Sequence, residues 1–387
     1  MIPFNKPYLA GKEMEYMREA VLSGKISGNG VFTRACENFL EQRYGFRRAL
    51  LTTSCTHALE MAALLLDLKA GDEVILPSFA YVSDANAFAL RGATLVFADS
   101  GTNDPNLDVH NLKKLITPNT KAILVVHYAG IACEMDTIMS IAKNHKLFVI
   151  EDAAHAIDAF YNEKPLGSIG HLAAFSFHET KNIISGEGGM LVINDERFLE
   201  RAEVLREKGT NRRAFLRGQV NKYEWVDLGS SWMPSELTAA YLAGQLENIE
   251  HIQKKRLATW QLYCELLSPL KKHGIQICAP PHSAKHNAHI FYLICRSAQE
   301  RDKLISHLKK HDVLAVFHYQ PLHASPYFLS GTESRISLPN AEHYADCLVR
   351  LPLYFELEPM QVRQICRFVL DFYDGIELAG VKKNSEA

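Results

Sequence analysis

The chain has 387 residues, of which 47% are hydrophobic and 22% are charged. These values are ordinary for a soluble globular protein and exclude a disordered chain, a collagen-like repeat and a long coiled coil. The 42 Lys and Arg residues against 44 Asp and Glu residues give a net charge of −2, so the charge balance indicates neither nucleic acid nor a membrane surface as a partner.

The eight cysteines are spread along the chain without a CxxC pair. This spread predicts free thiols in a reducing compartment, with no disulfide framework and no bound metal. No apolar run reaches the length of a transmembrane helix, about 18 residues, and the start Met1-Ile2-Pro3-Phe4 lacks the apolar segment of a signal peptide. We therefore expect a cytoplasmic protein.

The N-terminal half alternates short apolar runs with longer helical patterns, such as Met135–His145. The runs predicted as strands are residues 73–76, 94–98, 122–126, 147–151, 173–177 and 190–193. Strands that alternate with helices favour a mainly parallel sheet covered on both faces. In such sheets ligands gather at the carboxyl ends of the strands, so the functional residues should follow the apolar runs.

The pattern changes near Met233, where residues 235–262 predict one long helix with an apolar stripe. The further elements expected are strands at 289–295 and 313–318 and helices at 300–311 and 360–373. We therefore predict a large domain over residues 1–245 and a smaller α+β domain over residues 246–387.

Small and hydroxyl residues at 51–57 are followed at once by the apolar run 58–66, which predicts a buried helix. The free N–H groups and the positive dipole at the start of such a helix make a phosphate site. Taken alone, the motif is better explained by an ordinary Ser or Thr N-cap.

Two further motifs follow predicted strands. Asp152 ends the apolar run that begins at Phe148, with His155 three residues later, and Lys181 follows the next strand and precedes Gly186-Glu187-Gly188-Gly189. A lone carboxylate or lysine is usually a surface residue. Together with the helix start, however, they are what a pyridoxal phosphate site requires: a phosphate anchor, a partner for the ring nitrogen and a lysine for the Schiff base.

The chain resembles the DegT/DnrJ/EryC1/StrS sugar aminotransferases from Ile2-Pro3-Phe4-Asn5 to its C-terminal helices. The most specific motifs are Glu151-Asp152-Ala153-Ala154-His155 and Phe175-Ser176-Phe177-His178-Glu179-Thr180-Lys181-Asn182. The resemblance implies the α/β fold of aspartate aminotransferase (type I), with a mainly parallel seven-stranded sheet in the large domain. It also implies a homodimer with shared active sites.

The resemblance implies a role for each residue around the cofactor, pyridoxal 5′-phosphate. Lys181 is expected to form the Schiff base and then to move protons, and Asp152 to pair with the pyridine nitrogen. His155 is expected near the ring hydroxyl, and Tyr81 is expected to stack on the ring.

The phosphate contacts implied by the resemblance are the backbone N–H groups of Cys55 and Thr56 and the hydroxyl of Ser176. One motif departs from the family pattern. Many members carry Gly-x-Asn-x-Arg, whose asparagine reaches the phosphate in the neighbouring subunit, where this chain has Gly229-Ser230-Ser231-Trp232-Met233. Ser231 of the partner subunit is the residue expected to take that place.

Several stretches, such as Glu207-Lys208-Gly209-Thr210-Asn211-Arg212, resemble members of the family that aminate dTDP-linked sugars. The implied reaction transfers the amino group of L-glutamate to C4 of dTDP-4-dehydro-6-deoxy-D-glucose, with the galacto product preferred, for surface polysaccharide biosynthesis. The gluco epimer and a UDP-linked ketosugar stay open, because the motifs define neither the face of C4 that is protonated nor the nucleotide.

The segment 201–222 carries seven basic and two acidic residues, a local charge of +5. Beyond Gly209 the helical pattern stops, and a loop is expected that holds Arg212, Arg213, Arg217 and Lys222. A nucleotide-sugar enzyme must hold a diphosphate, and Arg and Lys are the usual means. These four residues, with His323 as a further candidate, are predicted substrate contacts.

The sequence allows two other interpretations. A Rossmann dehydrogenase needs G-x-G-x-x-G after the first strand, and the nearest fragment, Gly28-Asn29-Gly30, follows no convincing strand. A non-catalytic regulator that binds pyridoxal phosphate is the alternative from another class of protein. The presence of Lys181 favours the enzyme.

Overall fold

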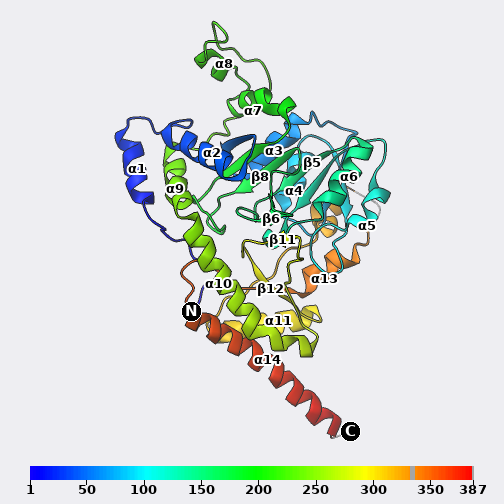
Figure 1. Ribbon diagram of the computed structural model, residues 1–387. Helices are drawn as coiled ribbons and strands as arrows, with labels where there is room; N and C mark the ends of the chain where they lie inside the picture. The colour runs from blue at the N-terminus through cyan, green and yellow to red at the C-terminus, as the bar shows by residue number, and fades with distance from the viewer. Residues whose placement is uncertain (332–335, 386–387) are drawn as a thin grey trace.

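A seven-stranded sheet forms the centre of the molecule in the computed structural model, which describes residues 1–331 and 336–385 (Figure 1). In spatial order the strands are β1 (Arg48–Thr52), β9 (Gly189–Ile193), β8 (Leu172–Ser176), β5 (Phe148–Asp152), β4 (Thr120–Val126), β2 (Glu73–Pro77) and β3 (Thr94–Ala98). All neighbouring strands from β8 to β3 are parallel, and β9 runs antiparallel to β8 and β1. The predicted sheet is confirmed, although β1 was missed because charged residues precede its short apolar run.

Helices cover both faces of this sheet, since its strands are apolar on both sides. Leu50 of β1 belongs to the cluster of buried side chains that includes α3 (Cys55–Leu65), α4 (Val82–Ala89) and α7 (Leu199–Arg206). Its neighbour Leu51 belongs to the opposite cluster, with α2 (Val31–Tyr44), α6 (Met135–His145) and α9 (Glu236–Glu247). Successive strand residues therefore face different helical layers.

The long helix predicted over 235–262 is two helices, α9 and α10 (Ile249–Leu267). Asn248, with φ −105° and ψ 10°, ends the first helix and begins the second. Its side chain donates to the carbonyl of Gly244 at 3.0 Å, so a local hydrogen bond competes with the helical pattern. Helix α1 (Glu13–Leu22) packs against α9. No helix in the described part of the chain is long and apolar enough to cross a membrane.

The C-terminal part is built on a second, antiparallel sheet of β10 (Gln276–Ile277), β12 (Phe291–Ile294) and β13 (Leu348–Leu351). It is covered by α11 (Ala298–Lys310), α13 (Pro339–Cys347) and α14 (Pro359–Ser385). The strand predicted at 313–318 is absent: that segment forms only isolated bridges, Ile2 with Val313 and Val316 with Arg350. The domain boundary at 245/246 stays a prediction.

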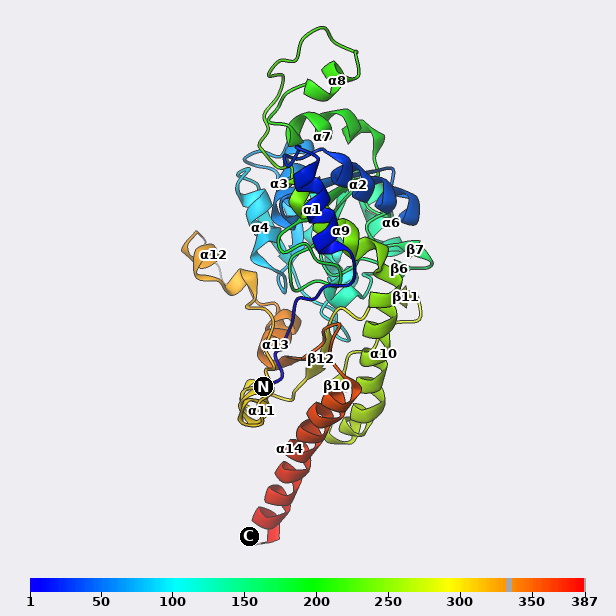
Figure 2. The same cartoon turned by 90° about the vertical axis from the view of Figure 1, so that its left-hand side faces the viewer.

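Three short strands form a small additional sheet, β6 (Phe160–Tyr161), β7 (Lys164–Pro165) and β11 (Ala284–Lys285). The remaining helices are α5 (Val109–Leu112), α8 (Arg212–Leu216) and α12 (Pro326–Ser330). Helix α8 lies in a segment that projects from the body beyond α7, which both views show (Figures 1 and 2). A loop was predicted here, and part of it is this short helix.

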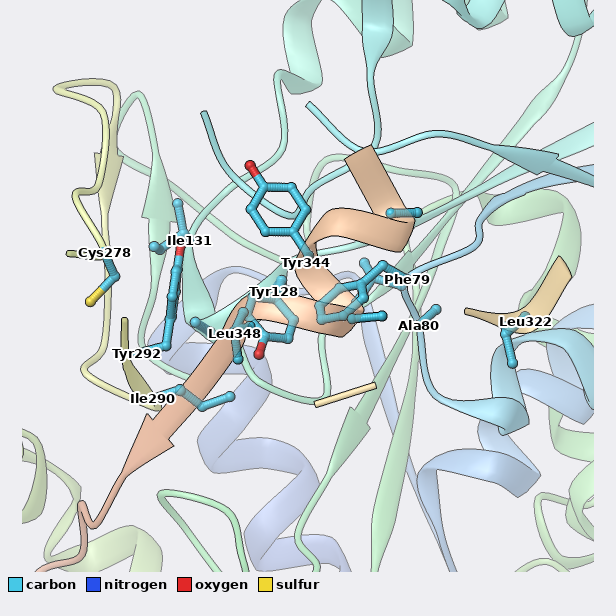
Figure 3. Close-up of a cluster of buried hydrophobic side chains, with 14 of the residues drawn as sticks. Phe79, Ala80, Tyr128, Ile131, Cys278, Ile290, Tyr292, Leu322, Tyr344 and Leu348 are labelled. Carbon is cyan, nitrogen blue, oxygen red and sulfur yellow. The ribbon is translucent and has the colours of Figure 1, made fainter. Parts of the chain in front are cut away.

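A buried aromatic cluster joins the two parts of the chain (Figure 3). The ring of Tyr128 lies 5.4 Å from that of Phe79 and 5.7 Å from that of Tyr292 on β12, and Phe79 lies 6.0 Å from Tyr344 on α13. Burial of such rings contributes about 1.5–3 kcal/mol each. The cluster therefore holds the C-terminal sheet against the carboxyl ends of the large sheet.

Candidate active site

A cavity of about 770 Å³ lies where the carboxyl ends of β5 and β8 meet the start of α3 and strand β13. Every residue predicted to hold the cofactor within one chain lines it: Cys55, Thr56, Tyr81, Asp152, His155, Ser176 and Lys181. These residues come from segments far apart in the sequence, and the parallel strands bring them together at one edge of the sheet.

Lys181 follows β8, and its backbone N–H donates to the carbonyl of His178 at 2.9 Å. Burial lowers the pKa of the Lys181 ammonium, while the nearby carboxylate of Asp152 opposes the shift and the guanidinium of Arg350 adds to it. A lowered pKa favours the neutral amine, which is the form that attacks a carbonyl carbon.

Asp152 ends β5 and is only 6% exposed. Its Oδ1 accepts the backbone N–H of Ala154 at 2.7 Å and lies 3.9 Å from the sulfur of Cys55. The carboxylate is therefore fixed in orientation at the cavity wall, as a partner for a protonated ring nitrogen must be.

The neighbouring Glu151 is also buried, although a surface position is usual for such a residue. Its carboxylate accepts an imidazole hydrogen bond from His127 Nε2 at 2.9 Å. It also accepts the backbone N–H groups of Gly167, Ile169 and Gly170. Glu151 does not line the cavity, so it organises the segment before β8 rather than the chemistry.

His155 is 6% exposed, and its Nδ1 accepts the backbone N–H of Ala129 at 3.3 Å. Burial lowers its pKa well below the usual range, and Lys181 and Arg350 lower it further. The imidazole is therefore neutral, and with Nδ1 acting as an acceptor we assign the hydrogen to Nε2. This nitrogen can donate to a hydroxyl or phenolate oxygen on the ring.

The start of α3 fits a phosphate. The Ser54 hydroxyl caps the helix by accepting the N–H of His57 at 3.1 Å. Among the described residues, the N–H groups of Cys55 and Thr56 have no acceptor. Gly189 lets β9 approach this turn, because a Cβ there would lie 2.2 Å from the carbonyl carbon of Ser54. The cap and the phosphate interpretations thus hold together.

Tyr81 immediately precedes α4 and is 57% exposed, with its ring 6.2 Å from that of Tyr319. It can face a planar ring in the cavity. Because the Tyr81 side chain is so exposed, the cavity is open to solvent on the side of Tyr81.

The residues predicted to contact substrate are not in the cavity of their own chain. Glu203 pairs with Arg213 at 2.6 Å and with Arg217 at 2.8 Å. Arg212 lies 3.8 Å from Glu207, and Lys222 is exposed in the projecting segment. Ser231, also exposed, pairs with Glu207 in an isolated bridge at the base of that segment.

His323 is buried and outside the cavity. Its Nδ1 lies 2.6 Å from the hydroxyl of Ser78, and its Nε2 lies 3.1 Å from the carboxylate of Glu342. Both ring nitrogens are used within the chain, so the structure does not bring His323 to the site.

Asp84 and Arg350 are among the charged cavity residues that were not predicted from the sequence. Asp84, in the first turn of α4, has no exposed surface. Arg350, in the middle of β13, pairs with no carboxylate among the described residues, and its Nη2 donates to the carbonyl of Phe317 at 3.2 Å. The sequence signal for Arg350 was a lone charge within the apolar run Leu348-Val349-Arg350-Leu351.

Comparison with known proteins identifies the chain. The model of the DegT/DnrJ/EryC1/StrS aminotransferase family matches residues 7–370. The chain belongs to this family. The predicted type I fold and the predicted cofactor, pyridoxal 5′-phosphate, are thereby confirmed.

The relatives that are 32% identical to the chain include two proteins with bacterial sources. The spore coat polysaccharide biosynthesis protein SpsC of Bacillus subtilis aligns over 384 residues, 97% of this chain and 98% of SpsC. The GDP-perosamine synthase of Escherichia coli O157:H7 aligns over 375 residues, 96% of this chain and 98% of that protein. Among solved structures, Spr1654 of Streptococcus pneumoniae in its PMP form has a TM-score of 0.90 at 24% identity and covers 97% of this chain and 100% of its own.

Proposed function

We propose that the chain transfers the amino group of L-glutamate to C4 of dTDP-4-dehydro-6-deoxy-D-glucose, giving preferentially the galacto amino sugar. The observation that carries the proposal is that Lys181, Asp152 and Arg350 line one cavity of about 770 Å³, and that Arg350 pairs with no carboxylate among the described residues. We place the activity in the cytoplasm, since none of the eight cysteines forms a disulfide.

The bound cofactor supplies a carbonyl carbon for amines and a ring that accepts electrons. Lys181 would hold the cofactor, and once a substrate amine has freed it, its neutral amine would take the proton from Cα of the amino donor. It returns a proton to C4 of the sugar in the second half-reaction. Asp152 stabilises positive charge at the ring nitrogen throughout. Because the two half-reactions share one site, ping-pong kinetics follow.

The environment of Arg350 favours an amino donor that carries a negative charge. Burial lowers the pKa of its guanidinium, and its Nε has no hydrogen-bond partner among the described residues. The ring of Phe4 lies 4.7 Å from the guanidinium carbon. An unpaired, partly buried guanidinium is costly unless an anion joins it. A carboxylate of glutamate in the cavity provides that anion with two parallel hydrogen bonds.

We therefore expect Arg350→Gln to raise the KM for glutamate by about ten- to a hundredfold, because a hydrogen bond to a charged group contributes about 1.5–3 kcal/mol. The KM for the sugar nucleotide should stay unchanged. Steady-state kinetics with each substrate varied in turn measures both. Arg301→Gln, on α11 and outside the cavity, is the control. Equal KM values for glutamate in Arg350→Gln and the wild type would exclude this donor site.

A homodimer with shared active sites is part of the proposal. Exposed apolar side chains gather on the projecting segment: Phe215, Leu216, Tyr223, Trp225, Val226 and Leu228. Trp225 is 77% exposed, which is unusual for a free surface. The open side of the cavity at Tyr81 is where a second copy would complete the site. Ser231 and the basic residues of the segment are then candidates for contacts with the partner's ligands.

Under this arrangement, at least one alanine substitution among Arg212, Arg213, Arg217 and Lys222 should raise the KM for the sugar nucleotide by about tenfold or more. The KM for glutamate should not change, because the diphosphate belongs only to the second substrate. Arg213 and Arg217 already pair with Glu203, so Lys222 and Arg212 are the stronger candidates. Four variants with the wild-type KM would move the diphosphate site elsewhere.

The acceptor is tested by offering the enzyme and glutamate a series of 4-dehydro-6-deoxy sugars linked to dTDP, UDP and GDP. The relative that is a GDP-perosamine synthase makes the GDP-linked sugar a necessary competitor. We expect the highest kcat/KM with the dTDP sugar, and NMR coupling constants of the product define the C4 configuration. Cofactor binding without turnover on any of them would instead favour the non-catalytic regulator.

A further inference from the structure

Asp84 is a buried carboxyl group without a conventional partner. It lies in the first turn of α4, lines the cavity and has no exposed surface. Neither of its oxygens has a hydrogen-bond donor among the described residues. A buried carboxylate without donors is strongly destabilising. The group is therefore expected to be stabilised by a proton of its own.

The neighbouring charged group is Asp152, which ends β5 and lines the same cavity as Asp84. Both carboxyl groups line the same cavity, and a hydrogen bond between them requires that one of them carries a proton. Burial is the main cause that raises the pKa of Asp84 well above its usual range, and the nearby charge of Asp152 raises this pKa further. Two carboxylates in contact cannot both ionise at low cost.

The other groups around Asp84 do not replace that proton. Lys181 favours the ionised form of Asp84 but is itself beside Asp152. The backbone of Tyr81 also favours the ionised form, yet it makes no hydrogen bond with either oxygen of Asp84. The thiol of Cys55 and the phenol of Tyr319 are neutral, because burial raises the pKa of each well above its usual range.

We propose that Asp84 and Asp152 share one proton, that Asp84 is the member that carries it, and that the resulting hydrogen bond positions Asp152 against the ring nitrogen of the cofactor. The assignment follows from the donors, because Asp152 accepts the N–H of Ala154 and Asp84 accepts none at good geometry. The proposal rests on the role given to Asp152 above. Asp84 acts through Asp152 and is a positioning residue.

The pair has a functional consequence in its charge. With one shared proton its net charge is −1, which matches a single protonated ring nitrogen. If both carboxylates were ionised, the extra negative charge would attract a further cation into the site. If Asp84 donated no hydrogen bond, Asp152 would be held on one side only, by the backbone N–H of Ala154. The hydrogen bond from Asp84 thus fixes the orientation of Asp152 without adding charge.

The first test uses the protein without cofactor and measures thermal unfolding of Asp84→Asn and the wild type against pH. An acid whose pKa is raised in the folded state loses its stabilisation as the pH rises from its unfolded value, about 3.9, toward the folded value. Asparagine does not titrate and can still donate to Asp152. The unfolding temperature of Asp84→Asn minus that of the wild type should therefore increase with pH.

Asp108→Asn is the matched control, since Asp108 caps α5 outside the cavity. Its offset from the wild type should be constant above about pH 5, because an ordinary aspartate is fully ionised there. An equally constant offset for Asp84→Asn would overturn the shared proton.

The second test uses the holoprotein and follows the visible absorbance of the bound cofactor against pH, together with cofactor affinity. Asp84→Asn should match the wild type within about twofold, because its amide replaces the donor. Asp84→Ala should bind the cofactor about tenfold more weakly, since a hydrogen bond to a charged acceptor is lost, and should shift the midpoint of the absorbance titration.

A wild-type titration in Asp84→Ala would overturn the positioning role, and so would an equal defect in the asparagine and alanine variants. Asp152→Asn is measured beside them, to separate the role of Asp84 from the role of Asp152 at the ring nitrogen. If that variant also keeps the wild-type titration, the role of Asp152 itself fails. The unfolding test still reports on the shared proton, and neither measurement depends on the identity of the sugar substrate.

Discussion

Replacing Lys181 by alanine is expected to abolish amino transfer while the fold and cofactor binding stay largely intact. The side chain supplies both the nucleophilic amine and the base that moves the proton, and general base catalysis alone contributes about 10²–10⁴-fold. Contacts elsewhere in the cavity, such as the start of α3, stay in place in the variant. Turnover, the unfolding temperature and the amount of cofactor retained on gel filtration measure the three parts of this prediction.

Lys181→Arg is the informative companion variant. Arginine keeps the length and the positive charge but stays protonated, so it can act neither as nucleophile nor as base, and we expect it to be as inactive as alanine. Lys303→Ala, an exposed lysine on α11, should behave as the wild type. More than about a hundredth of the wild-type rate in Lys181→Ala would show that another group is the base.

Asp152→Asn should preserve bound cofactor but slow the first half-reaction by about ten- to a thousandfold. An opposite charge in contact shifts the pKa of its partner by about 1–3 units, and an amide cannot hold the ring nitrogen protonated in this way. Stopped-flow absorbance after mixing with glutamate measures the rate in a single turnover, free of product release.

The competing explanation is that Asp152 only caps the turn at Ala154. In that case the variant would lose thermal stability and react at the normal rate. Glu151→Gln is the control, because this adjacent buried carboxylate binds His127 and three backbone N–H groups but does not line the cavity. It should lower the unfolding temperature and leave the half-reaction rate nearly unchanged.

The site residues that could be predicted from the sequence are those that lie at or just after the end of a strand. Asp152 and Lys181 follow apolar runs of a parallel sheet, and such runs end at the same edge. Because the strands are buried, their apolar runs could also be recognised in the sequence. The strand Thr94–Ala98 and the helix Met135–His145 have the predicted bounds.

The missed residues depend on tertiary packing. Asp84 shares its helix with the exposed Val82 and follows the exposed Tyr81, so no local pattern marks it as buried. Arg350 reaches the cavity only because the C-terminal sheet docks on the large one. The segment at 313–318 alternates like a strand, yet it pairs only at Val313 and Val316. Long-range pairing partners of this kind are not written in the local sequence.

The most direct test of the account is a two-step transfer with glutamate that carries an isotopic label on its amino nitrogen. The holoprotein is mixed with labelled glutamate and desalted, and dTDP-4-dehydro-6-deoxy-D-glucose is then added alone. Mass spectrometry should find the label in the amino sugar, in an amount that approaches one per active site, and none when Lys181→Ala is used. A label that never reaches the dTDP-linked sugar would contradict the account.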